Sequence, residues 1–257
     1  MTRYVGAVVD LDGVCYRGGA AVPGASDAVA RLRRAGVQVA FATNNATRTP
    51  RQSADELRAL GFDADDDQVV TSAVAAAALL EPDTRCLVIG AHGLREAARA
   101  RGCVLVDDPA DVQVVLVGLD KEVTYERLKR GTRALLAGAR FVASNTDATF
   151  PDVDGISPGA GAIVAALERA GGVTAEVAGK PHPALFDAAA ARLPDGPLLM
   201  IGDRVETDVA GAAALGWDTA LVLTGVTDPD ALAYADPAPT YVADDLASLV
   251  RQLLDGG

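Results

Sequence analysis

The sequence predicts an α/β protein: a doubly wound parallel sheet with a second α/β domain inserted into it. Two observations give this fold class. Short apolar segments rich in valine alternate with helical segments, which is typical of a parallel sheet whose strands are connected by helices. The alternation also runs in two series, because the pattern of residues 4–80 resumes only after residue 179. We therefore expect a core of residues 1–80 and 179–257 and an inserted α/β domain of residues 81–178.

The first series begins at residues 5–9, an apolar run that is too short for a helix and is typical of a buried strand. Thr49 followed by Pro50 indicates a helix start, since a hydroxyl caps the first turn and proline is accommodated at the first helical position. The remaining elements expected in the core are helix 24–35, strand 37–42, helix 50–60, helix 72–80, helix 183–192, strand 198–201, helix 208–215, strand 219–223 and helix 245–254.

The second series has strands and helices of its own and is long enough for a small domain. It is therefore expected to form a separate α/β layer. Its predicted elements are strand 86–89, helix 92–101, strand 112–117, helix 124–137, strand 141–143 and helix 158–171.

The composition and net charge exclude several classes of binding partner. Half of the 257 residues are apolar and the net charge is −12, which argues against binding to nucleic acid or to an anionic membrane surface. An anionic substrate would then need a metal or a locally positive site. The three cysteines form neither a disulfide framework nor a zinc pattern. No signal peptide and no apolar run of about 18 residues is found, so we expect a cytoplasmic protein.

Two carboxylates, Asp10 and Asp12, follow the first strand at positions i and i+2. Residues two apart on extended backbone project to the same side, so these side chains are expected to point the same way. Like charges so close raise one another's pKa values, and such a pair usually implies a bound cation or a shared proton.

Polar residues also follow two other strands of the core. Thr43 ends the strand after the first helix, and Asp203 follows strand 198–201. Ligands of open parallel sheets bind beyond the carboxyl ends of the strands, so Asp10, Thr43 and Asp203 are expected to share one crevice. Together with Asp208, which enters a helix that Thr207 could cap, the acids supply enough oxygen ligands for Mg²⁺.

A lysine, Lys180, lies where the chain returns from the inserted domain to the core. Lys180, in Gly179-Lys180-Pro181, can neutralise a carboxylate and the charge of a transferring phosphoryl group. A nucleotide-type phosphate loop is excluded, because that loop needs serine or threonine after the lysine.

Four motifs in order, Asp-x-Asp-Gly, Thr-Asn-Asn, Gly-Lys-Pro and Gly-Asp-x-x-x-x-Asp, closely resemble those of the haloacid dehalogenase-like phosphatases. The insertion between the second and third motifs resembles the C2-type cap of the subgroup that includes NagD, chronophin, phosphoglycolate phosphatase and 4-nitrophenylphosphatase. The resemblance covers essentially the whole chain.

The resemblance implies a role for each motif. Asp10 would be the nucleophile that forms an aspartyl-phosphate, and Asp12 the general acid and base. Thr43 and Lys180 would bind the phosphoryl group. Asn44 would add a contact through its backbone or its side chain, and the amide of Asn45 is by its residue type also suited to a phosphoryl oxygen. Mg²⁺ would be held by Asp10, the Asp12 backbone carbonyl and Asp203. Asp208 would support the water shell of the metal or Lys180.

Three further residues are candidates for substrate contact. Asn145 and Asp147 lie in a loop of the insertion, where loops on a rigid scaffold often carry specificity. Arg48, just beyond Thr43, would meet an anionic group of the substrate or pair on the surface. Caps of this type also lead us to expect a homodimer through the cap.

The predicted function is Mg²⁺-dependent hydrolysis of small phosphate monoesters such as phosphoglycolate, glycerol phosphate or 4-nitrophenyl phosphate. Nucleoside monophosphates and sugar phosphates are alternative substrates. Two other classes stay open: a phosphometabolite sensor that forms an aspartyl-phosphate without turnover, and a phosphomutase on the same core.

Overall fold

The computed structural model describes residues 2–152, 155–228, 230, 232 and 235–256. Contacts within the chain divide it into two compact units. The first unit comprises Met1–Thr43, Arg51–Val70 and Phe186–Gly257, and the second comprises Asn44–Pro50 and Thr71–Leu185.

The second unit contains the whole insertion expected from the sequence and three short segments on either side of it, residues 44–50, 71–80 and 179–185. As a division into folding domains, the boundaries at residues 80 and 179 stay a prediction. Each unit has its own parallel sheet, which confirms the α/β class and the inserted sheet.

The first unit is built on a six-stranded sheet in the order β15-β14-β13-β1-β4-β5. The central strand β1 pairs in parallel with β13 on one side and with β4 on the other. The sequence order therefore reverses next to β1, which is the position where open α/β sheets bind ligands. The strands are β1 (Gly6–Val9), β4 (Gln38–Thr43), β5 (Val69–Thr71), β13 (Leu198–Gly202), β14 (Asp218–Val222) and β15 (Tyr241–Ala243).

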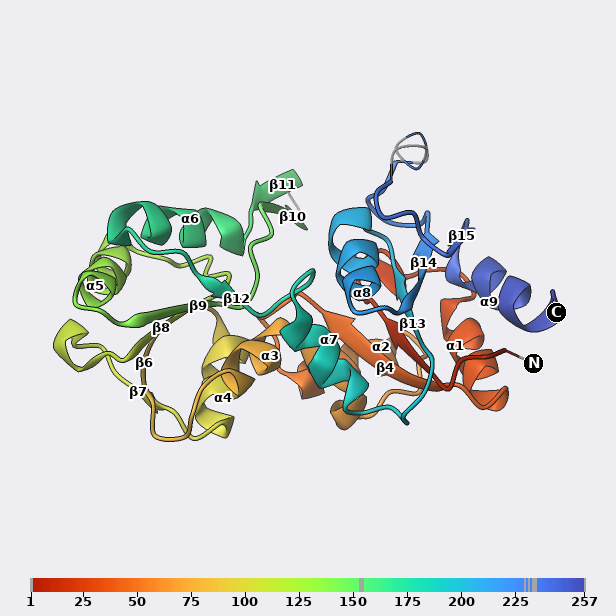
Figure 1. The fold of residues 1–257 in the computed structure, drawn as a ribbon, viewed down its shortest axis with the longest axis horizontal. Helices are drawn as coiled ribbons and strands as arrows, with labels where there is room; N and C mark the ends of the chain where they lie inside the picture. The colour runs from red at the N-terminus through yellow and green to blue at the C-terminus, as the bar shows by residue number, and fades with distance from the viewer. Residues whose placement is uncertain (1, 153–154, 229, 231, 233–234, 257) are drawn as a thin grey trace. The chain divides into compact units, whose positions relative to one another are not determined.

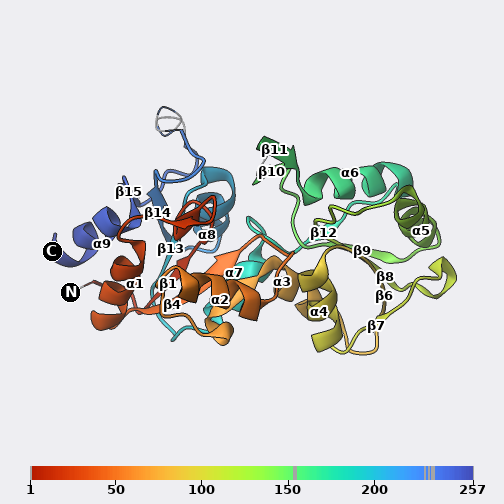
Figure 2. The same cartoon turned by 180° about the vertical axis from the view of Figure 1, so that it is seen from behind.

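Both faces of this sheet are buried, which explains why its strands have continuous apolar sequences. Val9, Phe41 and Ile201 belong to one cluster with residues of the helices, while the alternating residues Val8 and Met200 are equally buried. Helices α1 and α9 lie side by side in Figures 1 and 2. The helices are α1 (Ala25–Arg34), α2 (Pro50–Ala59), α7 (Pro183–Ala190), α8 (Ala210–Ala214), α9 (Leu246–Asp255) and the short 3₁₀ helix η1 (Asp66–Gln68).

The second unit has a five-stranded sheet in the order β12-β9-β8-β6-β7. Helices α5 and α6 lie on one side of it and α4 on the other (Figures 1 and 2). The strands are β6 (Arg85–Ile89), β7 (Val104–Leu105), β8 (Val114–Val117), β9 (Arg140–Ala143) and β12 (Glu176–Val177). The helices are α3 (Ser72–Ala78), α4 (His92–Ala100), η2 (Pro109–Asp111), α5 (Tyr125–Leu136) and α6 (Ala160–Gly171).

Two hairpins were not predicted from the sequence, β2 (Tyr16–Arg17) with β3 (Ala20–Ala21) and β10 (Thr149–Asp152) with β11 (Gly155–Pro158). Their strands are short and largely exposed where described, so they lack the apolar runs that marked the others.

The expectation of a helix starting at residue 208 with a Thr207 cap is wrong. A π-helical turn, η3 (Val205–Val209), begins earlier and α8 continues from it. Arg204 is the N-cap residue and provides no side-chain cap.

The three cysteines are buried free thiols. Burial, followed by the charges of Asp10 and Asp12, raises the pKa of the Cys15 thiol. Burial and the neighbouring Cys103 raise the pKa of Cys86 to about 12. None of the helices in the described part of the chain combines the length and the apolar character needed to cross a bilayer.

The last helix provides a test of the fold. Asp245→Ala is expected to lower the free energy of unfolding by about 1 kcal/mol, the usual cost of removing an N-cap. The Asp245 carboxylate accepts a hydrogen bond from the Ser248 backbone N–H at 2.6 Å, and this bond is the main cause of its lowered pKa. A lowered folded pKa stabilises the protein above the unfolded pKa and loses this effect as the pH falls through the folded value.

Urea unfolding of the wild type and the variant, from about pH 7 down to about pH 3, should therefore show a stability difference that shrinks in acid. The exposed neighbour Asp244 provides the control, since Asp244→Ala removes a carboxylate that does not cap the helix. A difference that is independent of pH would contradict the ionised cap.

Candidate functional site

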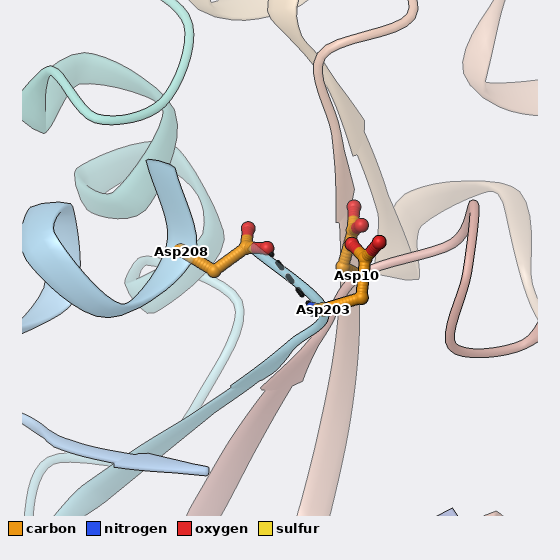
Figure 3. A group of neighbouring side chains, drawn as sticks. All are labelled: Asp10, Asp203 and Asp208. Carbon is orange, nitrogen blue, oxygen red and sulfur yellow. Dashed lines mark hydrogen bonds between the residues drawn. The ribbon is translucent and has the colours of Figure 1, made fainter. Parts of the chain in front are cut away.

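Three buried carboxylates of the first unit converge beyond the carboxyl ends of β1 and β13. Asp10 follows β1, Asp203 follows β13, and Asp208 lies in the π-turn η3. One ligand oxygen from each lies within 4.8 Å of the others, and all three residues are at most 7% exposed. Figure 3 shows the three side chains turned toward one another. We call this group the acidic triad.

Backbone groups hold Asp203 in place. Its carboxylate accepts a hydrogen bond from the Val226 N–H at 2.8 Å, and its carbonyl accepts one from the Thr227 hydroxyl at 2.6 Å. Two glycines make room for the side chain: a Cβ on Gly13 would lie 2.5 Å from the Asp203 carboxylate, and one on Gly225 would lie 1.9 Å from it. Any larger residue at these two positions would displace the carboxylate.

Asp208 folds back over the end of β13. Its Oδ2 atom accepts a hydrogen bond from the backbone N–H of Asp203 at 3.2 Å (Figure 3). The same atom accepts one from the Arg204 N–H at 3.1 Å. Gly202 permits this approach, because a Cβ there would lie 2.3 Å from the Asp208 side chain. The π-turn supplies the five-residue step that brings residue 208 back to residue 203. The Gly-Asp-x-x-x-x-Asp spacing thus places the second aspartate where its side chain can accept a hydrogen bond from the backbone N–H of the first.

The triad has an electrostatic requirement. Two unit charges about 5 Å apart repel by about 3 kcal/mol at an effective dielectric constant of about 20. Three such pairs would cost about 10 kcal/mol, which is comparable to the whole net stability of a typical domain. The group therefore needs a cation or bound protons, and its hard oxygen donors fit a divalent cation such as Mg²⁺.

Two other predicted site residues of this unit lie at the same sheet edge. Thr43 is the buried last residue of β4, so Asp10, Thr43 and Asp203 lie at the carboxyl ends of three neighbouring strands. Asp12 lies beyond β1 in an isolated bridge with Tyr16 and has an exposed side chain. Among the described residues its carboxylate is not part of the triad, and its metal contact through the backbone carbonyl stays a prediction.

The remaining predicted residues belong to the second unit. Lys180 is buried and Arg48 is exposed. The Asn45 side chain accepts hydrogen bonds from the backbone and the hydroxyl of Thr47. Asn145 donates to the Asn44 carbonyl at 2.7 Å and accepts from the N–H of Asp147 at 3.1 Å. The substrate contacts predicted for these residues are not tested by this geometry.

The sequence-based prediction missed the loop that follows β14. Residues 224–227 lie at the carboxyl edge of the same sheet, where Thr224 donates to the Gly13 carbonyl and the next three residues surround Asp203. The strand-end argument that found Asp10 and Asp203 applies equally to β14, so the signal was present in the sequence.

Comparisons with known proteins agree with this architecture. Residues 7–104 match a family model described as haloacid dehalogenase-like hydrolase, and residues 177–249 match a second model of the same kind. An acid sugar phosphatase from Staphylococcus haemolyticus is 35% identical over 98% of this chain and 98% of its own.

Solved structures give the same result. A glycerol phosphate phosphatase from Mycobacterium tuberculosis in complex with magnesium is 38% identical, with a TM-score of 0.90 over 98% of this chain and 78% of its own. A p-nitrophenyl phosphatase from Archaeoglobus fulgidus is 31% identical, with a TM-score of 0.91 over 97% of this chain and 99% of its own.

Proposed function

We propose that this chain, which belongs to the haloacid dehalogenase-like hydrolases, is a Mg²⁺-dependent phosphatase of small phosphate monoesters. The acidic triad carries the proposal, because three buried carboxylates at the ligand-binding edge of a parallel sheet need a cation. The similar proteins named above are phosphatases of small molecules, which supports the same reaction class.

Asp10 and Asp203 would hold Mg²⁺ through their carboxylates, together with the Asp12 backbone carbonyl, while Asp208 fixes the Asp203 backbone and offers a further oxygen. When bound, Mg²⁺ supplies charge neutralisation that lets an anionic carboxylate approach an anionic phosphate. The buried setting strengthens this effect, because water screens the charges less.

The carboxylates of Asp10 and Asp12 would have different roles, Asp10 as the nucleophile and Asp12 as the general acid and base. An Asp10 oxygen attacks phosphorus and forms an O–P bond as the bond between phosphorus and the leaving oxygen breaks. Asp12 donates a proton to that leaving oxygen and then accepts one from the water that hydrolyses the aspartyl-phosphate. The exposure of Asp12 supports this role, since a residue that exchanges protons with leaving group and water needs access to both.

Phosphate binding would fall to Thr43 and Lys180. Thr43 has a hydroxyl at the end of β4, beside the strand that presents Asp10. The assignment of Lys180 rests on the order of the four motifs. A buried ammonium is suited to this task, because its charge is costly to bury unless an anion accompanies it.

The proposed substrates are small monoesters: glycerol phosphate, sugar phosphates and p-nitrophenyl phosphate, as in the relatives, and phosphoglycolate. Asn145 and Asp147, at the carboxyl end of β9, stay candidates for substrate contact. The homodimer through the cap stays a prediction.

A panel of metabolite phosphates tests this function. We expect phosphate release from at least one small monoester with Mg²⁺, loss of that release with excess EDTA, and recovery when Mg²⁺ is restored. A phosphate-release assay with purified protein measures all three. Activity that persists in EDTA would contradict the role given to the triad.

The same assay separates the other classes. Phosphate transferred to a second hydroxyl of a sugar, rather than released, would identify a phosphomutase. Formation of an acid-stable but alkali-labile phosphoprotein without turnover would identify a sensor. Either result would overturn the hydrolase assignment.

A further inference from the structure

Asn44 is the residue after Thr43, and its side chain joins two distant segments of the second unit. Its carboxamide oxygen accepts a hydrogen bond from the Lys180 backbone N–H at 2.8 Å. Its amide nitrogen donates to the Lys180 carbonyl at 3.1 Å and to the Asp147 carboxylate at 3.1 Å. One side chain therefore holds both polar backbone atoms of Lys180.

The orientation of this carboxamide is determined by its partners. A carbonyl and a carboxylate only accept hydrogen bonds, so they must face the Asn44 nitrogen, while the Lys180 N–H must face the oxygen. Rotating the group by 180° would place an oxygen against two acceptors and an NH₂ against a donor. Asparagine is thus the only residue of this size that satisfies all three contacts.

The Asn44 backbone is held as well. Its carbonyl accepts hydrogen bonds from the Ser72 hydroxyl at 2.6 Å and from the Asn145 amide at 2.7 Å. Gly179 allows the close packing, since a Cβ there would lie 2.7 Å from the Asn44 carboxamide oxygen and 2.5 Å from the Ser144 carbonyl. The hydrogen bonds restrain Asn44, and the close packing at Gly179 restrains the segment that contains Lys180.

Both N–H donors of the carboxamide are used by the protein, so the Asn44 side chain has no donor left for a substrate. This changes the interpretation of the Thr-Asn-Asn motif. The motif implied a phosphate contact at Asn44 through its backbone or its side chain. The side-chain donors are directed to Lys180 and Asp147, and a contact through the backbone stays a prediction.

We propose that Asn44 is a positioning residue, whose carboxamide fixes the Lys180 backbone and so aims the lysine ammonium at the phosphate. The inference rests on the proposed function, in which Lys180 binds the phosphoryl group. Fixing the N–H and C=O groups of one residue sets the planes of the peptides on both sides, and with them the direction of the Cα–Cβ bond. Errors of about 1 Å in such a placement cost about 100-fold in rate.

A double-variant cycle between positions 44 and 180 tests the proposal. Two quantities are measured with Mg²⁺ present: the affinity for inorganic phosphate by calorimetry, and kcat/KM for 4-nitrophenyl phosphate. In the wild-type background, Asn44→Ala should weaken both by about 10-fold to 100-fold. In a Lys180→Met background, the same substitution should change both by less than about twofold, because residues that act through one group are not additive.

Asn44→Asp provides a variant of the same size. It keeps an oxygen for the Lys180 N–H but loses both donors and faces the Asp147 carboxylate, so it should reproduce the loss without leaving a cavity. Gln113→Ala is the matched control. It removes another carboxamide of the second unit, one that accepts a hydrogen bond from the Arg85 backbone N–H at 2.9 Å, and it should leave the phosphate affinity unchanged.

The outcomes separate the two claims. Equal losses from Asn44→Ala in both backgrounds would show a general structural role and would overturn the positioning role alone. Full phosphate affinity in Lys180→Met would overturn both the positioning role and the lysine's place in the proposed function. Unchanged affinity in Asn44→Asp would also overturn the inference, since that variant keeps the size of the side chain but not the donors.

Discussion

Asp10→Asn is expected to reduce phosphate release by at least about 10⁴-fold while raising the thermal stability of the metal-free protein. The loss follows because an amide cannot attack phosphorus as a carboxylate does. The gain follows because the variant removes one of three buried negative charges that lie within 4.8 Å of one another. The variant removes two of the three repulsions, each about 3 kcal/mol before hydrogen bonds and bound protons relieve part of it. Even a net gain of about 1 kcal/mol corresponds to a rise in Tm of roughly 2–4 °C for a protein of about this size.

Two measurements check this result: turnover of 4-nitrophenyl phosphate with Mg²⁺, and thermal unfolding in EDTA. Asp63→Asn is the control, because the Asp63 side chain is 98% exposed and is paired with Arg33 at the surface of the same unit. It should change neither quantity by much, as exposed ion pairs contribute about 0–1 kcal/mol.

The two measurements also have separate meanings. Retained turnover in Asp10→Asn would show that Asp10 is not the nucleophile. Lost turnover with an unchanged Tm in EDTA would show that protons already neutralise the triad when the metal is removed. A rise in Tm that disappears on adding Mg²⁺ would indicate that the cation and the amide relieve the same repulsion.

Much of the core could be predicted because each of its strands is recognisable from its own short run of residues. Strands of a buried parallel sheet are continuous apolar runs, and the residue that follows each run lies at the carboxyl edge. Asp10, Thr43 and Asp203 were found in this way, and β13-β1-β4 are indeed neighbours in the sheet. Each of these residues could be identified from the apolar run that precedes it, without knowledge of the other strands.

The parts that escaped prediction depend on contacts between distant residues. Asn44 lies 103 residues from Asp147 and 136 from Lys180, so no local pattern reveals where its carboxamide points. The π-turn at Val205–Val209 was missed for a different reason, since its sequence is as compatible with an α-helix beginning at residue 208. The backbone bond from the Val209 N–H to the Arg204 carbonyl at 3.3 Å, and the side-chain bonds of Asp208 to the backbone at 203 and 204, distinguish the two.

Gly225 also contacts a residue distant in the sequence, Asp203. Gly225→Ala is expected to disable the metal site without replacing any carboxylate. The new methyl group would lie 1.9 Å from the Asp203 Oδ2 atom and 2.4 Å from its Cβ atom, distances that no relaxed structure retains. Asp203 cannot simply move aside, because its carboxylate is bound to the Val226 N–H and its carbonyl to Thr227. Either the loop or the carboxylate must shift, and both alter the triad.

We therefore expect Gly225→Ala to weaken Mg²⁺ binding, measured by calorimetry, and to lower kcat/KM by roughly 100-fold, as a displacement of about 1 Å in an active site does. Raising the Mg²⁺ concentration should recover part of the activity, because the ligands are displaced and not removed. Gly131→Ala, within a helix of the other unit, is the matched control: its Cβ would meet side-chain methyl groups of Ile89 and Leu167 at 3.0 Å and of Val115 at 3.7 Å. If Gly225→Ala bound Mg²⁺ like the wild type, the Asp203 carboxylate would not need its observed position, and the triad would lose its claim to be the metal site.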